Sequence, residues 1–150
     1  LAPTESISAY LNFASGSASG TILDLTSSFQ ISEKFKVGLN VADYSGVATD
    51  DGYTGFALYP SVALTDGFSL GLRGENFKAK KASGYNLIGT GPAANESVTA
   101  LTLTANLKSG GLTFIPEFRL DNGSQDMFTD KNGSVTKSAA QFSMAVVYAF

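Results

Sequence analysis

Apolar side chains recur at every second position in eight segments of this chain, and each segment is about ten residues long. Successive side chains of a β-strand point to opposite faces, so a period of two predicts strands with one apolar and one polar face. No window of about ten residues follows the helical period of about 3.6 residues. The predicted strands cover residues 6–14, 21–31, 53–64, 68–77, 97–107, 112–120 and 140–150, together with a third segment that begins at Phe35. The sequence therefore predicts an all-β chain.

The connections between these segments alternate between short and long. Short turns lie at residues 32–34, 65–67 and 108–111, and longer polar connections lie at 15–20, 43–52, 78–96 and 121–137. In an antiparallel sheet this alternation places every short turn, and both chain termini, at the same end. Outer-membrane barrels have this layout, with short turns on one side of the membrane and long loops on the other. The alternation therefore predicts an antiparallel up-and-down sheet.

Composition favours a membrane as the surrounding of the apolar face. Only 15% of the residues are charged, against roughly 25% in soluble domains. No stretch approaches the 18 or so continuous apolar residues of a membrane-spanning helix. A soluble lipocalin-type barrel would turn the apolar face inward and carry many charges outside, but the predicted strands carry few. We therefore predict that residues 1–150 form one domain, an eight-stranded antiparallel up-and-down transmembrane β-barrel.

Several classes of function are disfavoured by residue types that the chain lacks. It contains no histidine and no cysteine, so the commonest general base, the commonest metal ligand and all thiolate ligands are missing. Its net charge of −3 argues against a nucleic-acid surface, which needs clustered basic side chains. We therefore expect a protein that is not an enzyme, holds no cofactor and no metal, and binds no nucleic acid.

Four charged residues on the polar faces of two predicted strands form the candidate site: Arg73 and Glu75, and Glu117 and Arg119. A charge on the lipid face at mid-membrane costs about 2–4 kcal/mol, so all four are expected to face the lumen and to pair across the one strand that separates them. They could act as a selectivity or gating cluster, or as a structural network of ion pairs. The interior of an eight-stranded barrel has room for little besides its own side chains, which favours the structural network.

The polar loop over residues 121–133 offers a second set of oxygen ligands. Asp121, Asp126 and Asp130 could hold Ca²⁺ at the surface, but their spacing does not match that of a calcium-binding loop. Turns in which Asp and Asn bond to nearby backbone groups explain the same composition. The loop is therefore interpreted as ordinary turns, and no metal site is predicted.

Three stretches of the chain resemble segments of a known family. They are residues 62–77 (VALTDGFSLGLRGENF), 112–121 (LTFIPEFRLD) and 141–150 (QFSMAVVYAF). Through them, residues 53–150 resemble the putative β-barrel porin-2, or OmpL-like, family of Gram-negative outer-membrane barrels. The resemblance implies a location in the bacterial outer membrane. It also implies that Tyr148 and Phe150 belong to a carboxyl-terminal signal for membrane insertion. The chain begins at Leu1 without a basic and then apolar leader, so we expect either that a secretory signal peptide has been removed or that an amino-terminal part is missing.

These expectations define the predicted role, an integral outer-membrane β-barrel protein of structural or accessory type whose lumen is largely filled by side chains. The expected partners are outer-membrane lipid, the barrel assembly machinery during insertion, and a second outer-membrane protein. Members of the resembled family are typically longer, so a porin-type passive channel for small solutes, with this chain as part of a larger barrel, is the alternative. A soluble lipocalin-like ligand carrier and a binding module that acts through its long loops also remain open.

Overall fold

The computed structural model describes residues 6–48, 50–81 and 93–150. These residues form strands and no helix, which confirms the predicted all-β class. The strands are β1 (Ile7–Gly16), β2 (Gly20–Gln30), β3 (Phe35–Ser45), β4 (Gly52–Thr65), β5 (Phe68–Ala79), β6 (Ser97–Ser109), β7 (Leu112–Gly123), β8 (Phe128–Thr129), β9 (Val135–Thr136) and β10 (Ser138–Tyr148).

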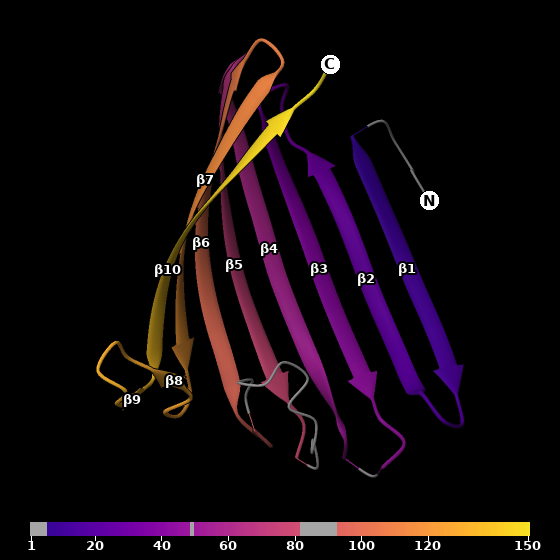
Figure 1. Cartoon of the computed structure of the whole chain (residues 1–150). Helices are drawn as coiled ribbons and strands as arrows, with labels where there is room; N and C mark the ends of the chain where they lie inside the picture. The colour runs from indigo at the N-terminus through magenta and orange to yellow at the C-terminus, as the bar shows by residue number, and fades with distance from the viewer. Residues whose placement is uncertain (1–5, 49, 82–92) are drawn as a thin grey trace.

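Eight of the strands form one sheet, in the order β1-β2-β3-β4-β5-β6-β7-β10, and each strand is antiparallel to its neighbours (Figure 1). Three connections, 31–34, 66–67 and 110–111, lie at the end where β1 begins and β10 ends, which we call the turn end (Figure 1). The other connections lie at the opposite end, the loop end; much of the predicted 78–96 connection falls outside the described residues. The predicted antiparallel up-and-down arrangement is confirmed.

Two features of the predicted barrel are wrong. The sheet is open, because β1 and β10 are its edge strands and no ladder joins them in the described part of the chain (Figure 1). The described residues also form ten strands rather than eight, since β8 and β9 pair as a small hairpin within the predicted 121–137 loop. Alternation determines the face of each side chain but not the partner of an edge strand. Strands of two residues are too short to show a period.

The first connection at the loop end is shorter than predicted, because β1 and β2 are joined by residues 17–19 alone. Gly20 has a φ of 75°, in the region that glycine adopts without a steric penalty. A Cβ atom at this position would collide with the carbonyl oxygen of Ser45 on β3. This glycine therefore permits both a tight turn and the close approach of β3.

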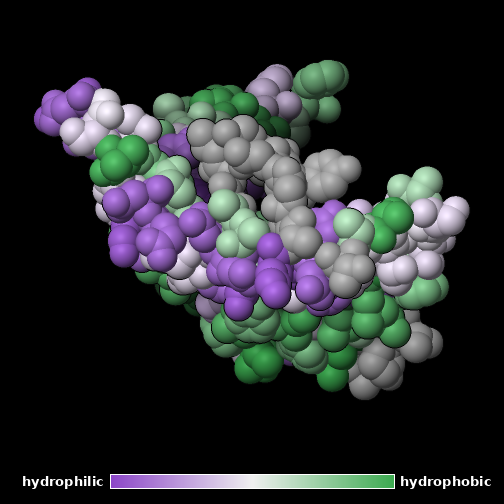
Figure 2. Space-filling model, turned by 90° about the horizontal axis from the view of Figure 1, so that it is seen from below, coloured by the Kyte–Doolittle hydropathy of each residue, from purple (hydrophilic) through white to green (hydrophobic). Residues whose placement is uncertain are grey.

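The apolar face of the sheet is exposed. Leu11 and Phe142 are 70% and 68% exposed, whereas the buried apolar residues in the described part of the chain are alanines: Ala57, Ala79 and Ala100. Soluble domains bury their large apolar side chains, so this face is suited to an apolar surrounding. Seen from the loop end, hydrophobic atoms gather along the outer side of the sheet, while many hydrophilic atoms lie along the rim (Figure 2).

The polar face lies on the inner, concave side of the curved sheet. The registers keep polar positions opposite one another from strand to strand, as in the row in which Thr102 of β6 lies between Arg73 of β5 and Arg119 of β7. A groove of about 450 Å³ runs along this face, and its lining includes Tyr59 and Glu117. The alternation predicted from the sequence thus separates an exposed apolar face from a polar face that carries the candidate site.

Candidate functional site

The candidate charged residues come from β5 and β7, the two strands that flank β6. Short side chains of β6 lie beneath them: Thr102 is 1% exposed and Ala100 is 2% exposed. In the ladders Thr102 stands between Arg73 and Arg119. Because the β6 side chains are short and the sheet is concave, the long side chains of β5 and β7 can meet above β6.

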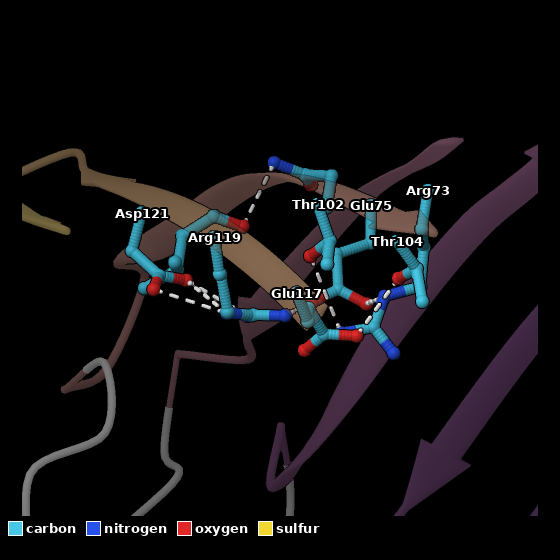
Figure 3. Close-up of polar contacts among 9 residues, drawn as sticks. Arg73, Glu75, Thr102, Thr104, Glu117, Arg119 and Asp121 are labelled. Carbon is cyan, nitrogen blue, oxygen red and sulfur yellow. Dashed lines mark hydrogen bonds and ion pairs between the residues drawn. The ribbon is translucent and has the colours of Figure 1, made fainter. Parts of the chain in front are cut away.

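Four charged side chains form a continuous series of contacts across β6, which we call the ion-pair chain (Figure 3). Nε of Arg73 lies 3.2 Å from Oε2 of Glu75, and Oε1 of Glu75 lies 2.5 Å from Nη1 of Arg119. Nη2 of Arg119 lies 2.8 Å from Oδ1 of Asp121, and its Nε donates to both carboxylate oxygens at 3.0 Å. Positive and negative groups alternate, so the two arginines and two carboxylates balance one another.

The ion-pair chain is partly accessible from the concave side. The side chains of Glu75 and Arg119 are 26% and 24% exposed, and that of Asp121 is 14% exposed. Withdrawing a charge from water is costly unless an opposite charge compensates it, and here each charge has a partner. The arrangement can therefore hold four charged groups on an inner surface while leaving polar atoms available to water and solutes.

Glu117 does not take the partner that sequence spacing suggests. The hydroxyl of Thr104 donates a hydrogen bond of 2.9 Å to Oε2 of Glu117 (Figure 3). No ion pair among the described residues includes Glu117. Its side chain instead lines the groove together with Arg73 and Lys36. Of the four predicted residues, the structure thus links Arg73, Glu75 and Arg119 directly and places Glu117 beside them.

Asp121 is a member of the site that was not predicted, because the predicted strand ends at residue 120 and places Asp121 in the following loop. Strand β7 continues to Gly123, and Asp121 lies opposite Ala100 on the polar face. The signal that could have revealed it is the two-residue step from Glu117 through Arg119 to Asp121. Extending the alternation by one step would have placed all three on one face.

A second polar cluster lies on β1, β2 and β3. The carboxylate of Asp24 accepts hydrogen bonds from Asn12 at 2.9 Å, from Asn40 at 2.7 Å and from Thr26 at 3.3 Å. All four residues lie on the polar faces of these strands, where Asn12 is opposite Asp24 and Thr26 is opposite Asn40. Their convergence depends on the register between three strands, which period-two patterning alone does not supply.

The residues of the predicted insertion signal lie at the end of the chain. Tyr148 is the last residue of β10, its ring centroid lies 6.2 Å from that of Phe150, and both side chains are exposed.

In the loop that precedes β10, Asp130 accepts hydrogen bonds of 2.8 Å from the backbone N–H groups of Asn132 and Ser134. This geometry is the turn that the sequence analysis preferred to a calcium site.

The described residues contain no group of three or more Asp, Glu, His and Cys side chains arranged to hold a metal ion. Within the same residues, no helix is long and apolar enough to cross a membrane.

An antiparallel up-and-down sheet with an exposed apolar face and an inner face lined by ion pairs defines the class of the protein: a porin-like β-barrel protein. A family model described as "Putative beta-barrel porin-2, OmpL-like" matches residues 1–150. The chain belongs to this family, and the match extends the resemblance of residues 53–150 to residues 1–52. Comparisons with curated proteins and with solved structures gave no significant match.

Proposed function

We propose that the chain is a porin-type passive channel for small solutes, and that its eight-stranded sheet forms part of the wall of a larger barrel. The observation that carries this proposal is the open sheet, in which β1 and β10 are edge strands. Hydrocarbon offers no hydrogen bonds to the backbone, so an edge strand within a membrane needs a pairing partner. Pairing of these two edges with further strands would close a barrel wider than eight strands.

The polar face supports an aqueous lumen. Barrels of about 16–18 strands enclose a water-filled channel, whereas about eight strands leave room for side chains only. The ion-pair chain is partly exposed, and the groove beside it is lined by Lys36, Tyr59 and Glu117, among others. Such a surface suits contact with water and polar solutes better than a packed interior.

The proposal includes a location and a set of partners. We place the protein in the outer membrane of a Gram-negative bacterium, without enzymatic activity and with lipid around its apolar face. Membership of the family and the exposure of Leu11, Phe142 and their neighbours support this location. The proposed partner during insertion is the barrel assembly machinery, and a second outer-membrane protein is a candidate partner afterwards.

Electrical recording tests the channel directly. Protein extracted in detergent from its native membrane should insert into a planar lipid bilayer and give stable single-channel currents. The control is the same preparation unfolded by heat in the same detergent, which should give none. A folded preparation that inserts but conducts no ions would contradict the porin function.

A structural barrel with a filled lumen is the second candidate, and the ion-pair chain favours it, because side chains that meet across β6 would help to fill a narrow interior. In that barrel β1 and β10 must pair. This pairing can be tested by cross-linking two cysteines placed on the polar faces of β1 and β10, such as Tyr10→Cys with Ser143→Cys, and by repeating the test at neighbouring positions. The chain contains no cysteine of its own, so no other thiol can react. Efficient cross-linking together with absent conductance supports the filled barrel, whereas conductance without cross-linking supports the porin.

A further inference from the structure

Three aromatic side chains contact one another on the polar face near the loop end. The ring centroids of Tyr44 on β3 and Tyr53 on β4 lie 5.4 Å apart, and those of Tyr53 and Phe77 on β5 lie 5.0 Å apart. The hydroxyl of Tyr44 donates to the carbonyl oxygen of Ser19 at 2.9 Å, which fixes the first ring. We call these three rings the aromatic strip.

The aromatic strip is not part of the lipid-facing surface. Tyr44 lies opposite Tyr53 in the ladder, and Phe77 lies opposite Gly55, in the same alternation as buried Ala57. The outward positions between them carry exposed side chains such as Phe56. Aromatic residues of an interfacial girdle would take the outward positions, so lipid contact does not explain this strip.

An open floor lies beside the aromatic strip. Gly55 and Ala42 are ladder partners, and a Cβ atom added to Gly55 would meet no heavy atom within 4 Å. In the ladders this floor is bounded by Phe77 on one side and by Asp24 on the other, and the rings of Tyr44 and Tyr53 occupy the next row toward the loops. We call the space above Gly55 and Ala42 the Gly55 shelf.

Hydrogen-bonding groups border the shelf on its remaining sides. Asp24 is held in place by the amides of Asn12 and Asn40. Asn40 and Glu75 belong to the next row of the polar face toward the turn end, where both lie opposite Ala57. The shelf therefore combines ring surfaces, a floor without bulky side chains, and fixed carboxylate and amide groups.

We propose that the Gly55 shelf binds a neutral oligosaccharide during its passage through the channel. The C–H faces of sugar rings stack on the electron-rich faces of aromatic rings, while sugar hydroxyl groups donate to carboxylates and accept from amides. Three rings in succession across three strands give an extended surface, which matches several linked sugar units better than one compact solute. This inference deepens the proposed channel function and rests on it for its biological meaning.

Binding to maltohexaose tests the inference without relying on conductance. Isothermal titration calorimetry of the protein in detergent should show saturable binding of this neutral six-unit sugar and none of polyethylene glycol of similar mass. Tyr53→Ala and Phe77→Ala should each weaken binding about tenfold, because each removes a stacking surface. Tyr53→Phe, which keeps the ring, should bind within about twofold of the original protein.

Gly55→Leu provides a test that removes no contact. The added side chain enters open space, so the protein should fold normally while sugar binding is lost. The matched control is Tyr10→Ala, which removes a ring from the polar face of β1 that lies opposite Thr26 rather than beside the shelf, and it should leave binding unchanged. The inference would be overturned by any of three results. These are the absence of saturable maltohexaose binding, unchanged binding of the sugar in Gly55→Leu, and binding of choline in place of the sugar. Failure to conduct would contradict the porin function alone, since calorimetry is independent of it.

Discussion

At the scale of single residues, two carboxylates on the same face have different surroundings. Glu75 lies between the guanidinium groups of Arg73 and Arg119, whereas Glu117 accepts a hydrogen bond from Thr104. An arginine that loses its only close counter-charge in a partly dehydrated site is destabilising. The two glutamates should therefore respond differently to the same chemical change.

Glu75→Gln should lower the free energy of unfolding by about 1–2 kcal/mol, a value reduced from that of a fully buried pair because the side chain is about a quarter exposed. Glu117→Gln should lower it by less than about 0.5 kcal/mol, since an amide can still accept the Thr104 hydrogen bond. Urea unfolding of both variants in lipid vesicles measures the difference. Equal losses of stability would contradict the assignment of Glu75 as the bridging residue.

The sequence was sufficient to place these residues on one face, but not to assign their partners. Period-two alternation puts Arg73, Glu75, Glu117 and Arg119 on polar positions whatever the register. Whether Arg73 lies across β6 from Glu117 or, as in the structure, from Arg119 depends on a displacement of two residues between β5 and β7. That displacement is decided by turn geometry and by packing over the whole sheet, which local patterning does not contain.

At the scale of the strand, the two faces of β6 should differ in their tolerance of charge. Leu103 lies near the middle of β6 on the apolar face and is half exposed, while Thr104 lies on the polar face opposite Glu117. Arginine at Leu103 should cost about 2–4 kcal/mol in a bilayer and prevent stable insertion. Arginine at Thr104 should be tolerated better, because it faces a carboxylate. Folding yields in lipid vesicles measure this difference, and Leu103→Ala is the control. Equal insertion of the two arginine variants would contradict the assigned faces.

The last strand carries the prediction about assembly. Phe150 lies beyond the end of β10 and is fully exposed, so removing it should change the stability of the folded protein by less than about 0.5 kcal/mol. If the terminal aromatic residue is read during insertion, its deletion should still reduce the amount assembled in the membranes of living cells. Quantification of membrane-assembled protein, alongside urea unfolding of the purified variant, separates the two effects. Wild-type abundance of the shortened chain would exclude the signal.

Strand positions were predictable because each long strand has an apolar face with a period of two. The short hairpin of β8 and β9 was not predictable, because two residues per strand contain no period. The tight connection at residues 17–19 was missed for a different reason. Ser and Gly around Gly20 have the composition of a loop, and only the structure shows the positive φ of Gly20 and the close approach of Ser45.

At the scale of the whole molecule, the balance of charges on the concave face should determine ionic preference. The ion-pair chain compensates its own charges. Glu117 and Asp24 instead bond to uncharged groups, so they can attract mobile cations, partly offset by Lys36 in the groove. The proposed channel should therefore prefer cations weakly.

Glu117→Gln should shift the reversal potential toward that of an anion-preferring channel, by an amount on the order of 10 mV in a tenfold KCl gradient, where perfect selectivity corresponds to about 59 mV. The shift follows because a carboxylate that lines the groove becomes neutral while the fold stays intact. Thr113→Ala, a nearby uncharged change on β7, is the control and should leave the potential unchanged. The effect should shrink as the mean salt concentration rises, because ions screen exposed charges. A reversal potential that is insensitive to Glu117 at low salt would show that this carboxylate does not face the conducting path, and the groove on the concave face would then not be part of the lumen.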